Sequence, residues 1–199
     1  PVDPSTAADV VLNASAIQVA ACFQHTCVIL DGKADGPDKV RCWGANEFGQ
    51  LGQNSNNVGP VIITSDPGMD VDLGLDPTTM KARSAKNIGC GRYHTCALTD
   101  DGDVFCWGFK AYGQLGYGEI MNNVGDGVGP SPGEAGSVPL GESAEMIAVG
   151  ADHSCALLQS GSLSCWGRSD VGQMGLGCTP KDAMDVKCNM VAPASIPYF

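Results

Sequence analysis

Basic residues are scarce in this sequence, and long apolar runs are missing. The chain has 11 Lys and Arg against 22 Asp and Glu, a formal charge of −11. Such a balance repels phosphate backbones and provides no basic stripe, so we expect no nucleic-acid partner. No apolar run approaches the ~20 residues of a membrane-spanning helix, so we expect no membrane span. The start at Pro1, with neither Met nor a signal-peptide pattern, fits a processed chain or part of a longer one.

Catalytic groups are scarce as well. The only histidines are His25, His94 and His153, and each precedes a Thr-Cys or Ser-Cys pair. The sequence has no G-x-S-x-G elbow, no P-loop and no Rossmann fingerprint. A triad needs unlike groups in unlike roles, so we expect the histidines to perform one structural hydrogen-bonding task three times. The alternative is that they converge on a catalytic or metal site. We expect no enzyme activity, no cofactor and no metal.

An internal repeat is present. CWGFKAYGQLG has counterparts in CWGANEFGQLG and CWGRSDVGQMG, and their tryptophans Trp43, Trp107 and Trp166 are 64 and 59 residues apart. A period of this length suits one small sheet per repeat.

Each repeat contains a hairpin pattern. In HTCALTDDGDVFCWG, apolar alternation on both sides of Asp-Asp-Gly indicates a strand, a turn and a strand. If Cys96 faces Cys106, the loop has three residues and ends at Gly102, where a left-handed conformation favours glycine. The third repeat has the same spacing, so Cys155 opposite Cys165 also leaves a three-residue loop.

Ten cysteines are present, an even number. Directly opposed strand residues have Cα atoms ~4.5 to 5.5 Å apart, within the reach of a disulfide. Six buried free thiols are the alternative, and a zinc site is disfavoured because no pair has the close spacing of structural sites. The predicted cross-strand disulfides are Cys27–Cys42, Cys96–Cys106 and Cys155–Cys165, the first around an enlarged loop with Gly36 and Pro37.

Four cysteines remain, Cys22, Cys90, Cys178 and Cys188, and they allow three pairings. The local option joins Cys178 to Cys188 and leaves Cys22 with Cys90, which would connect neighbouring repeats. Paired cysteines at this density favour an oxidising location: secreted, extracellular or an organelle lumen. One glycosylation acceptor triplet, at Asn13, is compatible with that route.

The ordered motifs together resemble the regulator of chromosome condensation repeat family, over roughly residues 19 to 177. Its units carry a glycine–x–x–histidine–threonine strand, a D-G turn, a tryptophan-glycine and a G-Q-L-G ending. The matching residues include His25, Trp43, Gly49 and Gln50; His94, Trp107, Gly113 and Gln114; and His153, Trp166, Gly172 and Gln173.

The resemblance implies an all-β fold, a β-propeller whose blades are four-stranded antiparallel sheets, typically seven. Three repeats cannot close such a ring, so we expect about three blades as an open propeller or a segment of a larger one. The expected parts are an N-terminal segment (1–18), repeat 1 with an acidic insertion (19–80), repeat 2 with a Gly/Pro-rich insertion (81–145), repeat 3 (146–177) and a C-terminal segment (178–199) resembling the start of a further repeat.

The acidic insertion contains Asp66, Asp70, Asp72 and Asp76. Their spacing matches no calcium loop, so we expect a solvated loop, with calcium binding as the alternative. The insertion from Tyr117 to Glu145 is expected to be a long surface loop, the usual place for binding specificity.

An open arc leaves sheet faces and strand edges uncovered. We therefore expect a non-enzymatic protein-interaction or scaffold module whose partner is another protein, a large complex or sister subunits that cover the open blade ends. The alternatives are a regulator of nucleotide exchange on a small GTPase, which the family's founding role implies, and a secreted enzyme inhibitor.

Overall fold

The computed structural model describes residues 9–32, 36–55, 69–120, 122–175 and 190–196, which form strands and one short helix. The elements are β1 (Ala16–Ala21), β2 (His25–Leu30), β3 (Lys39–Gly44), β4 (Ala85–Cys90), β5 (His94–Thr99), β6 (Val104–Gly108), α1 (Pro132–Ala135), β7 (Ala144–Val149), β8 (His153–Leu158), β9 (Leu163–Gly167) and β10 (Met190–Ile196). No helix within these ranges is long and apolar enough to cross a bilayer.

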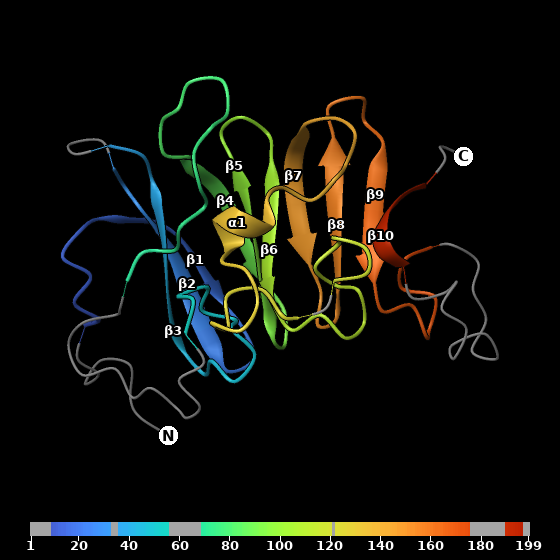
Figure 1. The fold of residues 1–199 in the computed structure, drawn as a ribbon, viewed down its shortest axis with the longest axis horizontal. Helices are drawn as coiled ribbons and strands as arrows, with labels where there is room; N and C mark the ends of the chain where they lie inside the picture. Colours follow the sequence, from blue (N-terminus) through green and yellow to red (C-terminus); the bar gives the residue numbers. More distant parts are fainter. Residues whose placement is uncertain (1–8, 33–35, 56–68, 121, 176–189, 197–199) are drawn as a thin grey trace.

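The strands form three antiparallel sheets, which we call the first, second and third blades. Their strand orders are β1-β2-β3, β4-β5-β6 and β10-β9-β8-β7. The blades follow one another in sequence order along the long axis of the molecule (Figure 1). Strand β4 packs against β1 and β2, and β7 packs against β4 and β5. The expected all-β arrangement of about three propeller-type blades is therefore confirmed.

The central hairpins have the expected register. In the second blade Cys96 lies opposite Cys106, and the Thr99 N–H donates to the Asp103 carbonyl at 2.9 Å. Gly102 ends the three-residue loop with φ +88°. The third blade repeats this geometry, because the Leu158 N–H donates to the Ser162 carbonyl at 2.8 Å. Both three-residue loops are confirmed.

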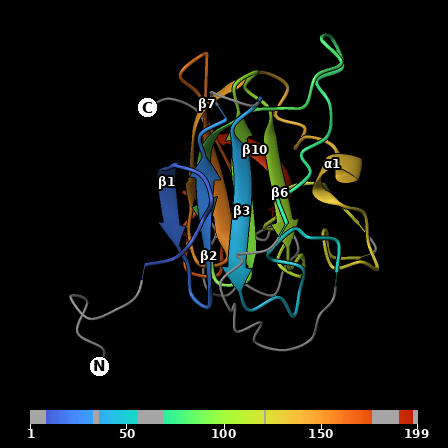
Figure 2. The ribbon, with the colours of Figure 1, turned by 90° about the vertical axis from the view of Figure 1, so that its left-hand side faces the viewer.

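Burial along the strands follows the number of neighbouring blades. Every residue of β5 and β6, in the middle of the arc, is buried. Strand β8 alternates between buried and half-buried residues, as a strand covered on one face does. Strand β1 is mostly exposed, with Ile17 53% and Val19 66% accessible. The first blade therefore presents a sheet face that no described strand covers (Figure 2).

The described aspartates of the acidic insertion do not converge. The Asp70 carboxylate accepts two hydrogen bonds from the Arg41 guanidinium, at 2.7 and 2.9 Å. Asp72 accepts from the Gly74 N–H, and Asp76 caps a separate turn. Each carboxylate thus stabilises its own stretch of backbone or its own ion pair. Asp66 lies outside the described residues.

The Gly/Pro-rich insertion carries the one helix of the described ranges, α1. Ser131 caps it, accepting from the Glu134 N–H while the Glu134 carboxylate accepts from the Ser131 N–H. The preceding part of the insertion pairs with the second blade through reciprocal hydrogen bonds between Gly108 and Val124. This loop is consequently anchored to the sheet at several points.

Candidate functional site: the junctions between blades

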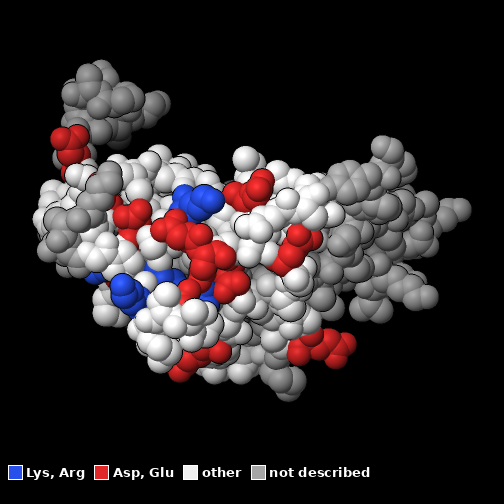
Figure 3. Space-filling view, turned by 90° about the horizontal axis from the view of Figure 1, so that it is seen from above, with Lys and Arg blue, Asp and Glu red and all other residues white. Residues whose placement is uncertain are grey.

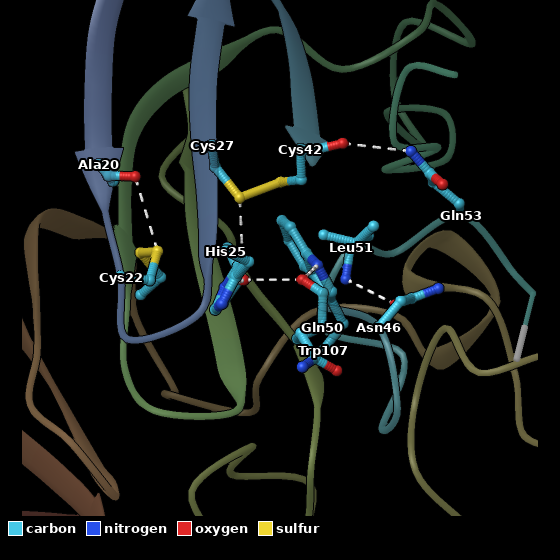
Figure 4. Close-up of a disulfide and its surroundings, with 12 residues drawn as sticks. Ala20, Cys22, His25, Cys27, Cys42, Asn46, Gln50, Leu51, Gln53 and Trp107 are labelled. Atoms are coloured by element: carbon cyan, nitrogen blue, oxygen red, sulfur yellow. Dashed lines mark hydrogen bonds between the residues drawn. A yellow bond between two sulfur atoms is a disulfide. The ribbon is translucent and has the colours of Figure 1, made fainter. Parts of the chain in front are cut away.

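Adjacent blades are joined by a hydrogen-bonded group that we call the junction latch. At the first junction, Nε2 of His25 lies 2.9 Å from Oγ1 of Thr95 in the next blade. The Thr95 hydroxyl donates to the Gln50 carbonyl at 2.9 Å. The Trp107 indole N–H donates to the same carbonyl at 3.0 Å. Figure 4 shows this arrangement beneath the Cys27–Cys42 disulfide.

The second junction repeats the latch with equivalent residues. Nε2 of His94 lies 3.0 Å from the Ser154 hydroxyl, which donates to the Gln114 carbonyl at 3.1 Å. The Trp166 indole N–H donates to that carbonyl at 2.9 Å. Two independent junctions with one geometry show that the latch belongs to the repeat rather than to a single site.

The G-Q-L-G turn of one blade is shaped to seat the tryptophan of the next. The Gln50 side-chain oxygen accepts from the Phe48 N–H at 2.9 Å and closes the turn. Gly52 has φ +69°, and a Cβ there would lie 2.8 Å from the Trp107 indole nitrogen. Glycine is required by both the left-handed backbone and the close approach of the ring.

The latch histidines are neutral at neutral pH. Burial lowers the pKa of His25 to about 4, and burial lowers the pKa of His94 to about 3. The single hydroxyl hydrogen of Thr95 is donated to Gln50, so the hydroxyl oxygen accepts from Nε2–H of His25. The proton of this imidazole is thereby placed on Nε2.

The first blade carries the hydroxyl and the indole of a further junction latch, but no described residue supplies the matching histidine and turn carbonyl. Trp43 and Thr26 stand where Trp107 and Thr95 stand in the second blade. Trp107 is fully buried, whereas Trp43 is half-buried. No residue within the described ranges hydrogen-bonds to the Trp43 indole or the Thr26 hydroxyl.

We call this surface the first-blade end face, defined by Ile17, Val19, Thr26 and Trp43. Gln18, between the two exposed aliphatic residues, points toward the second blade and exchanges two hydrogen bonds with the Ile88 backbone. Because side chains alternate along a strand, Val19 faces the opposite way. Ile17 lies at a β-bulge between Ala16 and Gln18, and its side chain is exposed. Figure 2 looks onto the sheet that carries this face.

The third blade carries the opposite half of the latch. His153 is half-buried, and its ring has no hydrogen-bond partner among the residues that the structure describes. The Gln173 side-chain oxygen accepts from the Val171 N–H at 3.0 Å, so the third G-Q-M-G turn is closed like the other two. The two ends of the arc therefore carry complementary halves of one interaction.

The predicted cysteine pairs lie together in the structure. Disulfides join Cys27–Cys42, Cys96–Cys106 and Cys155–Cys165 across their hairpins, with Cα atoms 4.1 Å apart in each, and Cys22–Cys90 between the first two blades, with Cα atoms 5.5 Å apart. Cys178 and Cys188 lie outside the described residues. Their pairing, like the chemical state of the others in the cell, stays a prediction.

The repeat residues named from the sequence fall into three sets. The structure brings together His25, Gln50 and Trp107 at the first junction, and His94, Gln114 and Trp166 at the second. Trp43, His153 and Gln173 stand at the ends of the arc. The turn glycines Gly49, Gly113 and Gly172 have left-handed φ angles of +80°, +75° and +79°.

The sequence reasoning missed Thr95 and Ser154, the hydroxyl groups that join each latch. A signal was present, because Thr or Ser directly follows every one of the three histidines. Side-chain alternation places that hydroxyl on the sheet face opposite the histidine, toward the preceding blade.

One group within the described ranges has the separations of a metal site. Cys22, His25 and Cys90 each offer one ligand atom, and these atoms lie within 4.8 Å of one another.

The end of the molecule that carries the hairpin loops is acidic. Figure 3 shows Asp and Glu side chains in a row across this face, with few Lys or Arg among them. Arg83 lies between two of these carboxylates and pairs with Asp101 and Asp103. Acidic side chains predominate on the described part of this face.

The fold and the latches define the class: an open segment of a repeat β-propeller whose blades are joined head to tail. Sequence profiles of the regulator of chromosome condensation (RCC1) repeat match residues 16–50, 85–114 and 147–173 in one form and residues 38–98 and 101–157 in another. The chain belongs to the RCC1 repeat family.

The relatives include a receptor and a probable ligase. The chain is 30% identical over 169 residues to the ultraviolet-B receptor UVR8 of Arabidopsis thaliana, covering 83% of this chain and 32% of the receptor. It is 32% identical over 179 residues to the probable E3 ubiquitin-protein ligase HERC4 of Rattus norvegicus, covering 87% of this chain and 14% of the ligase. The chain thus spans a third or less of these relatives, and the match to the ligase is confined to a small part of it.

Solved structures show the same fold. Human WBSCR16 aligns with a TM-score of 0.70 at 24% identity, over 94% of this chain and 42% of that one. Saccharomyces cerevisiae Prp20p, studied for its binding to Gsp1p and histones, aligns with a TM-score of 0.64 at 20% identity, over 92% of this chain and 38% of that one. These likenesses establish the β-propeller architecture.

Proposed function

We propose that this chain is a non-enzymatic interaction module that binds a further blade of the same repeat type through its first-blade end face. The observation that carries the proposal is the unpaired half-latch of Thr26 and Trp43, set beside the exposed side chains of Ile17 and Val19. The two internal junctions define the chemistry of the occupant.

An incoming blade must supply two groups. It needs a turn carbonyl that accepts from the Trp43 indole N–H and the Thr26 hydroxyl, and a histidine Nε2–H that donates to that hydroxyl. The third blade of this chain has both kinds of group in the Gln173 turn and His153. A second copy, docked head to tail, is therefore the simplest occupant that fits.

Sedimentation velocity of the purified chain tests this proposal. We expect concentration-dependent association between about 1 μM and about 1 mM. The Thr26→Val substitution removes the bridging hydroxyl with little change of shape, and a hydrogen bond contributes about 1 kcal/mol. The association constant should fall about fivefold, since 1.4 kcal/mol corresponds to tenfold.

The matched control is Thr78→Val, an exposed threonine in the turn capped by Asp76. It should associate as the unmodified chain does. A chain that stays monomeric over the whole concentration range would refute the proposal, as would equal association of the Thr26→Val and Thr78→Val variants.

We propose further that the module works in an oxidising compartment. Four described disulfides support this location, because such pairs persist in secreted and lumenal proteins. Non-reducing mass spectrometry of the protein from its native source should find these pairs joined. If all ten cysteines were free thiols, the proposed oxidising compartment would be wrong. The proposed association through the first-blade end face would be unaffected.

Regulation of a small GTPase is the second candidate, favoured by the fold shared with Prp20p, whose binding to Gsp1p has been studied. A nucleotide-release assay with purified small GTPases separates the two candidates. Acceleration of release would establish exchange activity, whereas an unchanged rate together with head-to-tail association supports the interaction module.

A further inference from the structure

Cys22 occupies a position that is glycine in the other two repeats. Gly91 and Gly150 stand three residues before His94 and His153, as Cys22 stands before His25. A Cβ built at Gly91 or Gly150 would overlap the imidazole of the same motif. In the first blade this position therefore carries a sulfur directly beside the histidine ring.

A second thiol comes from the neighbouring blade. Cys90, the last residue of β4, is joined to Cys22, and their Cα atoms are 5.5 Å apart. The two sulfurs and one ring nitrogen of His25 lie within 4.8 Å of one another. The three groups come from distant parts of the chain, so the close cysteine spacings of known zinc motifs do not reveal them.

One ring nitrogen of His25 is free to bind a metal. Its Nε2–H donates to the Thr95 hydroxyl, and Nδ1 is buried without a hydrogen-bond partner. His25 itself is only 3% exposed. Metal-binding histidines typically donate the N–H of the second ring nitrogen to a fixed acceptor, which leaves the other lone pair for the metal. Nδ1 of His25 has that free lone pair.

The Cys22–Cys90 disulfide is accessible, unlike the hairpin disulfides of the first two blades. Cys22 and Cys90 are half-buried and line an open cleft of about 450 Å³ together with Phe23, Arg92 and Tyr93. The hairpin cysteines of the first two blades are at most 1% exposed, whereas Cys155 of the third blade is half-buried. A dithiol in solution therefore reaches the disulfide between the blades before the hairpin disulfides of the first two blades.

We propose that Cys22, Cys90 and His25 form a zinc site that is closed by the disulfide and opened by its reduction. A dithiol reductant delivers two electrons and two protons to the disulfide and is itself oxidised to a disulfide. Zn²⁺ then displaces the two thiol protons to solvent and bonds both thiolates and Nδ1 of His25. Water from the cleft takes the fourth position, and the two thiolates neutralise the charge of the ion.

The geometry permits this exchange. A tetrahedral site with Zn–S bonds of about 2.3 Å places its sulfurs about 3.8 Å apart. The Cα atoms of Cys22 and Cys90 are 5.5 Å apart, so we expect rotation about the two Cα–Cβ bonds to reach that separation without a change in the backbone.

The experiment uses the full chain, treated anaerobically with limiting dithiothreitol and titrated with Co²⁺ as a spectroscopic substitute for zinc. Alkylation and peptide mapping should show Cys22 and Cys90 released before the four hairpin cysteines of the first two blades. Co²⁺ should then give a thiolate-to-metal charge-transfer band and tetrahedral ligand-field bands at one ion per chain, and Zn²⁺ should abolish both. Cys178→Ser with Cys188→Ser provides a background in which those two thiols do not contribute.

His25→Ala and His94→Ala form the matched pair. Each removes one latch histidine, but only His25 adjoins the two thiols. His25→Ala should weaken Co²⁺ binding at least tenfold and change the ligand-field bands, and His94→Ala should leave both unchanged. If either variant fails to fold, Cys22→Gly, which restores the residue of the other repeats, should abolish the charge-transfer band.

If the reduced chain showed no charge-transfer band with Co²⁺, the proposal would be wrong, and the Cys22–Cys90 disulfide would have a structural role only. Identical spectra for the two histidine variants would also overturn it, because the third ligand would not be His25. Neither outcome bears on the end face, whose test measures association of the oxidised chain.

Discussion

Gly116 and Gly118 allow the seat of the junction latch to be tested with one type of substitution. Both have positive φ, +81° and +74°, so alanine at either position meets the same left-handed backbone strain. That strain costs roughly 1 to 2 kcal/mol. A Cβ at Gly118 meets nothing within 4 Å, whereas at Gly116 it would lie 2.8 Å from both the Trp166 indole nitrogen and a Val138 methyl group.

Gly118→Ala should therefore lower the free energy of unfolding by the backbone strain alone. Gly116→Ala should lower it by that amount plus about 1 to 3 kcal/mol, the usual cost of overpacking a filled interior. Trp166 is fully buried, so its ring has no open space into which to move. Urea unfolding of the oxidised chain, followed by tryptophan fluorescence, measures the difference. Equal losses for the two variants would refute the assignment of Gly116 as the seat of Trp166.

Three further predictions follow from the latch and the hairpins. Selective loss of the Cys96–Cys106 bridge should lower the free energy of unfolding by about 3 kcal/mol, measured by urea unfolding of a doubly Ala-substituted chain; no loss would contradict a structural role. Thr95→Val should cost about 1 to 3 kcal/mol, because it leaves Nε2–H of His25 buried without an acceptor, whereas the exposed Thr78→Val should cost almost nothing in the same assay. Burial lowers the pKa of His94 to about 3, so below pH 6.5 the unfolded chain binds a proton that the folded chain does not. The free energy of unfolding should fall as the pH drops from 6.5 toward 3 and stay flat with respect to this group above 6.5; His94→Gln should reduce the slope, and an unchanged slope would contradict the buried neutral imidazole.

The hairpins were predictable from sequence because their determinants are local. Opposing Cys96 to Cys106 fixes every other pair in that hairpin, and a left-handed glycine at Gly102 then follows from the loop length. The structure has this register and a φ of +88° at Gly102. The alternation of apolar and polar residues within one fifteen-residue stretch was sufficient to predict this register and loop.

The latch was not predictable in the same way, because its members are far apart in sequence. His25 and Thr95 are 70 residues apart, and Trp107 is 57 residues from the carbonyl that it binds. The sequence identified Trp107 and the Gln turn as positions of the repeat motif. It did not show that the turn of one blade holds the tryptophan of the next, since that contact depends on the distance and angle between sheets.

Equivalent residues in the three repeats differ in burial, and the proposed function rests on this difference. His94 is fully buried in the middle of the arc, while His153 is half-buried at its end; Trp107 is fully buried, while Trp43 is half-buried. Each repeat carries hydrogen-bonding groups for a neighbouring blade on both sides. A blade at the end of the described arc therefore has donors and acceptors that no described neighbour satisfies. Those groups specify the chemistry of the proposed occupant more narrowly than exposed apolar area does. By the same reasoning, a position at which one repeat departs from the motif, as Cys22 does in place of glycine, is where we expect a property beyond the shared fold.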